Sequence, residues 1–159
     1  MKNISTLMLC ICITCTSLTA FSQNNQDVPP LNEPDYNKPK LFASYPERIP
    51  VDLASLNSLF GVSLGSSVDV NVAEGSTFRL TGEVVSNVSK YDNRIKSVVI
   101  RSTNFPGARL CINRITGEDG SISYTGRLLS KDYGDVYELQ NNNNHFVLVK
   151  RGYYDIVTE

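Results

Sequence analysis

Two side chains of this chain have the chemistry of a nucleophile and a general base. His145 is the only histidine, and Cys111 is the only cysteine after residue 22. Together they could form a thiolate nucleophile with its base. Cys111, however, lies inside an apolar run typical of a strand, His145 borders an Asn-rich turn, and no Gly-x-Ser-x-Gly motif is present. We therefore predict a packed Cys111, a surface His145 and no catalytic residue.

An enzyme remains the alternative hypothesis. A small secreted hydrolase with an unrecognised active site could use His145, Glu83 and an arginine as acid, base and phosphate clamp. Only the residue types favour this assembly, since their spacing carries no known signature. The principal prediction is a protein without enzymatic activity.

Several acidic residues are candidates for calcium ligands. Glu118-Asp119 and the pair Asp132 and Asp135 lie in expected turns, but they lack the repeated Asp/Asn spacing and the terminal Glu of a calcium-binding loop. We interpret these carboxylates as turn residues, and we expect neither a metal nor a cofactor.

The segment 94–114 contains five basic residues and no acidic one, and it is the strongest candidate for a binding site. Two strands are expected in this segment. If they pair as a hairpin, the cations of the hairpin could bind an acidic protein or an anionic glycan of the cell envelope, with an affinity that falls as salt rises. The alternative is that they keep strand edges soluble and pair with Glu83, Glu118 or Glu138. Asn141 to Asn144 and Tyr153-Tyr154 are further candidates for the rim of a ligand site. The five basic residues are Arg94, Lys96, Arg101, Arg109 and Arg114.

The elements that position these residues show the two-residue period of β-strands. Apolar side chains such as Phe78, Leu80 and Val84 fall on even numbers with polar ones between them, and Gly82 is interpreted as a bend or bulge. Asp52 and Gly61 are placed to begin and end a short helix, and 153–159 could form one helical turn. Strands are predicted at about 68–72, 78–88, 95–101, 108–115, 122–129, 136–140 and 146–150.

The links between these strands are too short for helical crossovers. They contain turn pairs such as Pro106-Gly107 and Asp119-Gly120. The predicted fold is therefore all-β, a single antiparallel meander of about seven strands that forms a small barrel or a two-sheet sandwich.

The N-terminus predicts export. Lys2, an apolar run and Ala20-Phe21-Ser22 form the pattern of a cleaved signal peptide over 1–22, and the segment Ala20 to Gln23 resembles the end of signal peptides of exported Bacteroidota proteins. A Pro/Asn-rich flexible linker is expected over 23–48, with its first docking side chains from Leu41 onward, and the β-domain over 49–159. The expected location is the periplasm, the surroundings of the outer membrane or the extracellular space.

Charge balance and cysteine positions limit the classes of partner and cross-link that we expect. Without Lys2, 14 of the 15 basic side chains remain against 16 acidic ones, a balance that favours no nucleic-acid partner. Three of the four cysteines lie in 1–22, so no disulfide within the trimmed chain is expected. No transmembrane segment is expected after signal cleavage, and the oligomeric state is left open.

Overall fold

A computed structural model describes residues 35–75, 78–142 and 145–157. Backbone contacts divide the chain into Met1–Glu33 and Pro34–Glu159, and all described residues belong to the second unit. The predicted signal peptide and the first part of the predicted linker lie outside the described residues. None of the described helices is long and apolar enough to cross a membrane.

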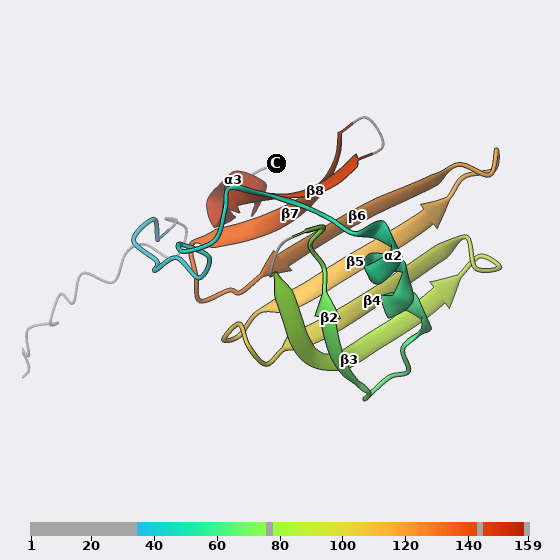
Figure 1. Cartoon of the computed structure of the whole chain (residues 1–159), viewed down its shortest axis with the longest axis horizontal. Helices are drawn as coiled ribbons and strands as arrows, with labels where there is room; N and C mark the ends of the chain where they lie inside the picture. The colour runs from blue at the N-terminus through green and yellow to red at the C-terminus, as the bar shows by residue number, and fades with distance from the viewer. Residues whose placement is uncertain (1–34, 76–77, 143–144, 158–159) are drawn as a thin grey trace, which may run out of the picture. The chain divides into compact units, whose positions relative to one another are not determined.

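The described residues of the second unit form one antiparallel sheet of eight strands (Figure 1). The sheet order is β1-β8-β7-β6-β5-β4-β3-β2, so every strand from β2 to β8 pairs with its neighbour in the sequence. This confirms the predicted antiparallel meander. The strands are β1 (Arg48–Pro50), β2 (Ser67–Asn71), β3 (Arg79–Lys90), β4 (Ile95–Ser102), β5 (Arg109–Thr116), β6 (Ile122–Leu129), β7 (Asp135–Asn142) and β8 (His145–Gly152).

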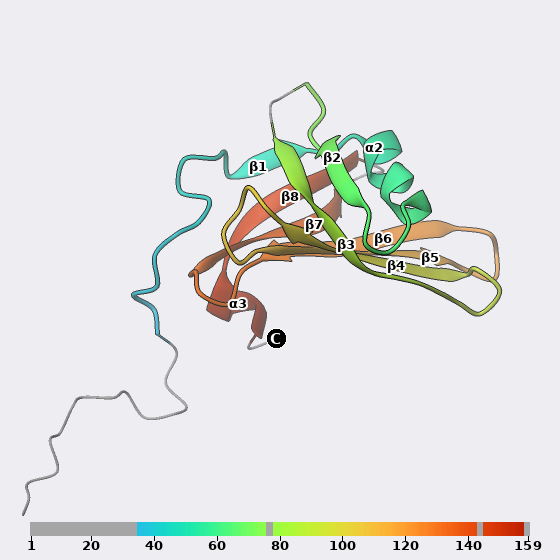
Figure 2. The same cartoon turned by 90° about the horizontal axis from the view of Figure 1, so that it is seen from below.

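The sheet curls until its two edges meet at one corner (Figure 2). An isolated antiparallel bridge joins Val51, just after β1, to Ala73, just after β2. The Asp52 N–H donates to the Val72 carbonyl at 3.0 Å, and the Glu74 N–H donates to the Pro50 carbonyl at 2.8 Å. The result is a half-barrel with a single seam, which is closer to the predicted barrel than to a two-sheet sandwich.

Alternation of side chains along each strand fills the inside of the curl. Val98 and Ile100 of β4 lie opposite Ile112 and Leu110 of β5, and all four side chains are buried. We call this side the concave face and the other side the convex face. Along a strand without a bulge, the parity of a residue number therefore tells which face its side chain lies on.

Two short helical segments cover the open side of the concave face. The helix α2 (Leu53–Ser58) continues into a 3₁₀ turn, η1 (Leu59–Gly61), and Leu56 and Leu59 are buried against the sheet. The Asn87 side-chain amide of β3 donates to the carbonyls of Phe60 and Val62, which fixes the end of η1. A third segment, α3 (Tyr153–Val157), follows β8 as the predicted C-terminal helical turn.

The bulge of β3 lies three residues beyond the predicted position. The register with β4 shifts between Val84 and Ser86, so Val85 is the extra residue, whereas Gly82 pairs regularly with Val68 and Ser102. Gly82 is required for another reason. A Cβ at this position would overlap the Arg101 carbonyl oxygen and the Ile100 side chain. Of the two predicted irregularities, a bend or a bulge, the bulge is therefore not at Gly82.

Residues 35–47 form a strap that packs along the domain. Phe42 is fully buried, and its ring contacts the rings of Phe105 and Tyr137 at centroid distances of 5.4 and 4.8 Å. The Tyr137 hydroxyl donates to the Pro46 carbonyl, and the Lys150 ammonium donates to the Tyr45 carbonyl at 2.6 Å. The described part of the predicted linker is thus attached to the fold at several points.

One interior pair of strands separates along half its length. β6 and β7 are in register only from Gly126 opposite Leu139 to Leu129 opposite Val136. Beyond Gly126 the β7–β8 hairpin lifts away from β6, as Figure 1 shows. On the concave side, the ring of Tyr124 in β6 contacts that of Phe146 in β8 at 5.3 Å, so two aromatic side chains keep β6 in contact with the β7–β8 hairpin.

Candidate functional site

The five predicted basic residues belong to the β4–β5 hairpin and the turn before it. β4 and β5 pair as predicted, with Lys96 directly opposite Arg114 and Arg101 directly opposite Arg109. Lys96 and Arg114 have the parity of the buried Val98 and Ile112, so they lie on the concave face. Arg101 and Arg109 have the opposite parity and lie on the convex face. The hairpin therefore carries two cationic pairs on opposite faces instead of one patch.

The concave pair lies at the margin of the helical cover. Lys96 and Arg114 are half-buried, one row beyond the buried Val98–Ile112 row, and α2 reaches their own row at Tyr124. Their cross-strand neighbours in the same row, Ser89 and Tyr124, are uncharged. The Tyr124 hydroxyl is already engaged, since it donates to Asn57 of α2 at 2.7 Å.

Neither cation of this pair has an acidic partner among the described residues. The Nε of Arg114 is shielded from solvent and has no hydrogen-bond acceptor there. A shielded guanidinium N–H without an acceptor is unusual, because buried donors nearly always find one. The concave pair therefore holds two positive charges without an acidic partner and one shielded N–H without an acceptor.

The convex pair has a different environment. Arg101 and Arg109 are both exposed, and Arg101 lies directly opposite Glu83 of β3, although no ion pair forms between them within 4.0 Å. Arg109 lines a shallow depression with Lys131, Leu129 and Gly107. These cations are solvated and partly balanced by a neighbouring carboxylate.

Arg94 lies in the turn between β3 and β4. Tyr91, Asp92 and Asn93 all have positive φ (52°, 52° and 68°), and this tight left-handed turn directs the chain back into β4. The Arg94 guanidinium contacts the Glu118 carboxylate at 3.4 Å. Since both side chains are largely exposed, this pair contributes little to stability. Of the three predicted carboxylate partners, Glu118 is thus the one that pairs with any of the five basic residues within the described ranges.

Glu138 pairs elsewhere. Its carboxylate lies 3.2 Å from the guanidinium of Arg127 and 3.7 Å from that of Arg151, on the strands flanking β7. This cross-strand arrangement stabilises the β6–β8 part of the convex face. It leaves the cations of the β4–β5 hairpin without that partner.

His145 and Cys111 lie in different surface depressions. His145 is exposed at the start of β8 and lines a depression of about 450 Å³ with Glu74 and Asp52. Cys111 is half-buried on the convex face, in a depression of about 380 Å³ that also holds Arg127 and Glu138. Burial raises the pKa of the Cys111 thiol, which disfavours the thiolate. No hydrogen bond joins the two residues in the described structure.

The acidic residues weighed as calcium ligands have structural roles. The Asp119 carboxylate accepts from the N–H and the hydroxyl of Ser121, and these bonds lower the pKa of Asp119 and close the β5–β6 turn. Asp135 is buried and binds the strap, while Asp132 is exposed. Within the described ranges, no group of three or more His, Cys, Asp or Glu side chains could hold a metal ion.

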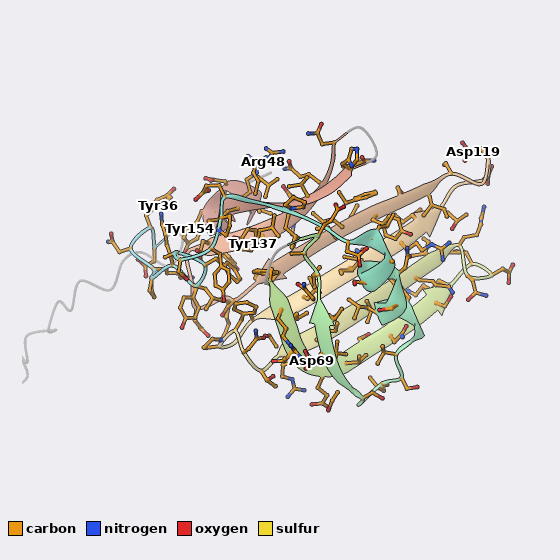
Figure 3. All side chains as sticks on the ribbon, in the orientation of Figure 1. Tyr36, Arg48, Asp69, Asp119, Tyr137 and Tyr154 are labelled. Carbon is orange, nitrogen blue, oxygen red and sulfur yellow. The ribbon has the colours of Figure 1, made fainter. Side chains whose placement is uncertain are left out.

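The C-terminal tyrosines contact the strap. The Tyr154 hydroxyl accepts the Asp35 N–H at 3.0 Å, and the Lys38 ammonium lies 5.1 Å from the Tyr153 ring centroid and 5.4 Å from that of Tyr154. Figure 3 shows Tyr36 beside Tyr154 at this end of the domain. Asn141 and Asn142 are exposed at the end of β7, and Asn143 and Asn144 lie outside the described residues.

Sequence reasoning missed the depression around Cys111. It forms where β6 and β7 diverge, between residues as distant in sequence as Asn113 and Leu139. Gly126, at which the pairing of β6 with β7 begins, was the one available signal, since glycine in a strand often marks an irregularity. Comparison of the chain with protein-family models, with curated proteins and with solved structures gives no match.

Proposed function

We propose that this chain is an exported, non-enzymatic β-domain that binds an anionic macromolecular partner in the cell envelope. The β4–β5 hairpin is its contact surface. One observation carries the proposal: the hairpin holds two directly opposed cationic pairs, Lys96–Arg114 and Arg101–Arg109, and none of the four forms an ion pair among the described residues.

Like charges directly opposite each other destabilise an antiparallel sheet. Here the effect occurs twice in one hairpin, while carboxylates elsewhere on the sheet do find partners, as Glu138 does. An external anion would remove the repulsion on binding. The same field would attract an acidic partner over about a Debye length, roughly 8 Å at physiological salt.

The export part of the proposal rests on the N-terminal sequence. Lys2, the following apolar run and Ala20-Phe21-Ser22 form the signal-peptide pattern. Mass spectrometry of the protein from its native envelope fraction tests this part. A mature N-terminus at Gln23 supports export with cleavage, and an uncleaved chain in the cytoplasm contradicts it.

Affinity capture tests the binding part. The full chain is expressed with its leader and an affinity tag, and bound components are recovered from the envelope fraction at low and at high salt. We expect a specific partner at low salt that is lost at high salt. A variant with all four opposed cations changed to Gln should lose it at low salt too. Retention by that variant would contradict the hairpin as the contact surface.

The position of His145 favours a small hydrolase as the second candidate. His145 shares its depression with the exposed Glu74, which could orient the imidazole. The third polar residue there, Asp52, is committed to capping α2. Assays of the purified protein against nucleic acid, ester and glycan substrates, with His145→Ala as the control, decide this candidate. Turnover that disappears in the variant supports it.

A further inference from the structure

We propose that Lys96 and Arg114 form the recognition site for a carboxylate side chain on an acidic protein partner, with an aliphatic side chain beside it packing on Ile122. This inference rests on the proposed binding function and names the class of partner and the face that it contacts. Arg101 and Arg109, on the other face, contribute only long-range attraction.

The geometry of the concave pair suits one anionic group. Directly opposed residues of an antiparallel pair have Cβ atoms about 4.5–5.5 Å apart, so one carboxylate can lie between an ammonium and a guanidinium. Since both side chains are half-buried, the contact is only partly screened by water. The Nε of Arg114 is shielded from solvent, so the carboxylate contacts the guanidinium through its terminal nitrogens.

The neighbouring side chains favour a protein over a glycan. Ile122 has the parity of Tyr124, so it lies on the concave face, and 46% of its surface is exposed. Sugar-binding surfaces use exposed aromatic rings. The aromatic ring in the same cross-strand row as Lys96 and Arg114 is that of Tyr124, which is 8% exposed and covered by α2. Exposed aliphatic surface next to arginine is instead typical of protein interfaces.

The convex pair provides a matched control. Lys96→Gln/Arg114→Gln and Arg101→Gln/Arg109→Gln each remove two positive charges from the same two strands. Both double variants therefore change the net charge equally. The two variants should therefore differ in partner affinity only if the concave pair forms a specific site. Each change also relieves a like-charge contact, so we expect both variants to unfold at or above the wild-type temperature.

The test uses two probes of equal charge with the full chain. One is a labelled peptide of alternating glutamate and leucine, and the other is an oligogalacturonate. We expect the peptide to bind the wild type more tightly than the glycan does. The concave double variant should lose about tenfold or more in affinity, which corresponds to about 1.4 kcal/mol, and the convex one about twofold. Arg114→Lys keeps the charge but not the planar fork, and it should also weaken peptide binding.

The outcomes distinguish a failure of the Lys96–Arg114 recognition site from a failure of the proposed binding function. Equal losses in the two double variants, or tighter binding of the oligogalacturonate, overturn the recognition site and leave the proposed function standing. Failure of the peptide to bind, while envelope capture still yields a partner, does the same. If the wild type captures nothing, the proposed function itself fails.

Should the concave variant not fold, amide chemical shifts of the wild type with peptide decide: changes at 96, 114 and 122 support the site, and changes confined to 101 and 109 overturn it.

Discussion

The Asp135 carboxylate accepts a hydrogen bond from the backbone N–H of Phe42 at 2.9 Å, across 93 residues of sequence. Its other oxygen accepts the N–H of Leu41 at 2.6 Å. Asp135 is itself buried at the start of β7, so these two bonds satisfy both the carboxylate and the strap. They attach the segment ahead of β1 to the start of β7, the third strand from that edge of the sheet.

Asp135→Ala should therefore destabilise the domain. The change leaves two amide donors of the strap without an acceptor, at a combined cost of roughly 2–4 kcal/mol. Urea unfolding followed by tyrosine fluorescence measures the loss. Asp132→Ala is the control, because Asp132 is exposed and should change stability little. Equal effects of the two substitutions would contradict this role of Asp135.

Tyr137→Phe should reduce the loss of folding stability that occurs as the pH rises above about 10. Burial, followed by the negative charges of Glu47 and Asp135, raises the pKa of Tyr137 well above its usual value near 10. The folded state keeps the proton that the unfolded chain loses, so this contribution is complete below about pH 10 and declines as the pH rises further. Denaturation midpoints from neutral to alkaline pH measure the decline. An unchanged slope in the variant would show that other groups cause it.

Gly82→Ala should destabilise the sheet without disturbing any side-chain hydrogen bond. The added Cβ would overlap the Arg101 carbonyl oxygen, which is backbone and cannot move independently. Overpacking of this kind costs about 1–3 kcal/mol. Gly61→Ala is the matched control, because no atom lies within 4 Å of a Cβ at that position and its effect should stay within about 0.5 kcal/mol. Thermal unfolding of both variants gives the comparison.

Asp52→Ala should weaken α2, and the effect should depend on pH. The Ser55 hydroxyl and then the Ala54 N–H hold the pKa of Asp52 below its usual value. The contribution of this cap is therefore present above about pH 4 and disappears as the pH falls through the lowered pKa. Asp52→Asn should keep the cap at neutral pH and lose the acid dependence. Acid unfolding of the three proteins tests both statements, and an identical acid slope in wild type and Asn variant would refute them.

Much of the sheet could be predicted from local patterns. All seven predicted strands exist, and β6 has the predicted bounds Ile122–Leu129, because alternation and turn residues are local properties. The helix that begins after Asp52 was also predicted. β1 was missed because it has three residues, ends in proline, and forms only by pairing with the distant β8.

The arrangement of the candidate site depends on information that one strand does not contain. The sequence predicted that β4 and β5 pair, but not their register. Register decides that Lys96 meets Arg114 and that Arg101 meets Arg109 on the other face. The unpartnered Nε of Arg114 and the exposure of Ile122 are tertiary properties, which the sequence of one strand does not contain.

The seam at Val51 and Ala73 has a mechanical consequence. β1 is held to β8 by three registered residue pairs, and it closes the curl through that one bridge. A force that pulls on the chain ahead of residue 35 reaches the strap and β1 first and peels these contacts one after another. The seven remaining strands form a continuous meander that this force loads only afterwards. Tension at the N-terminal side would thus open the seam while the hairpin that carries Lys96 and Arg114 keeps its shape.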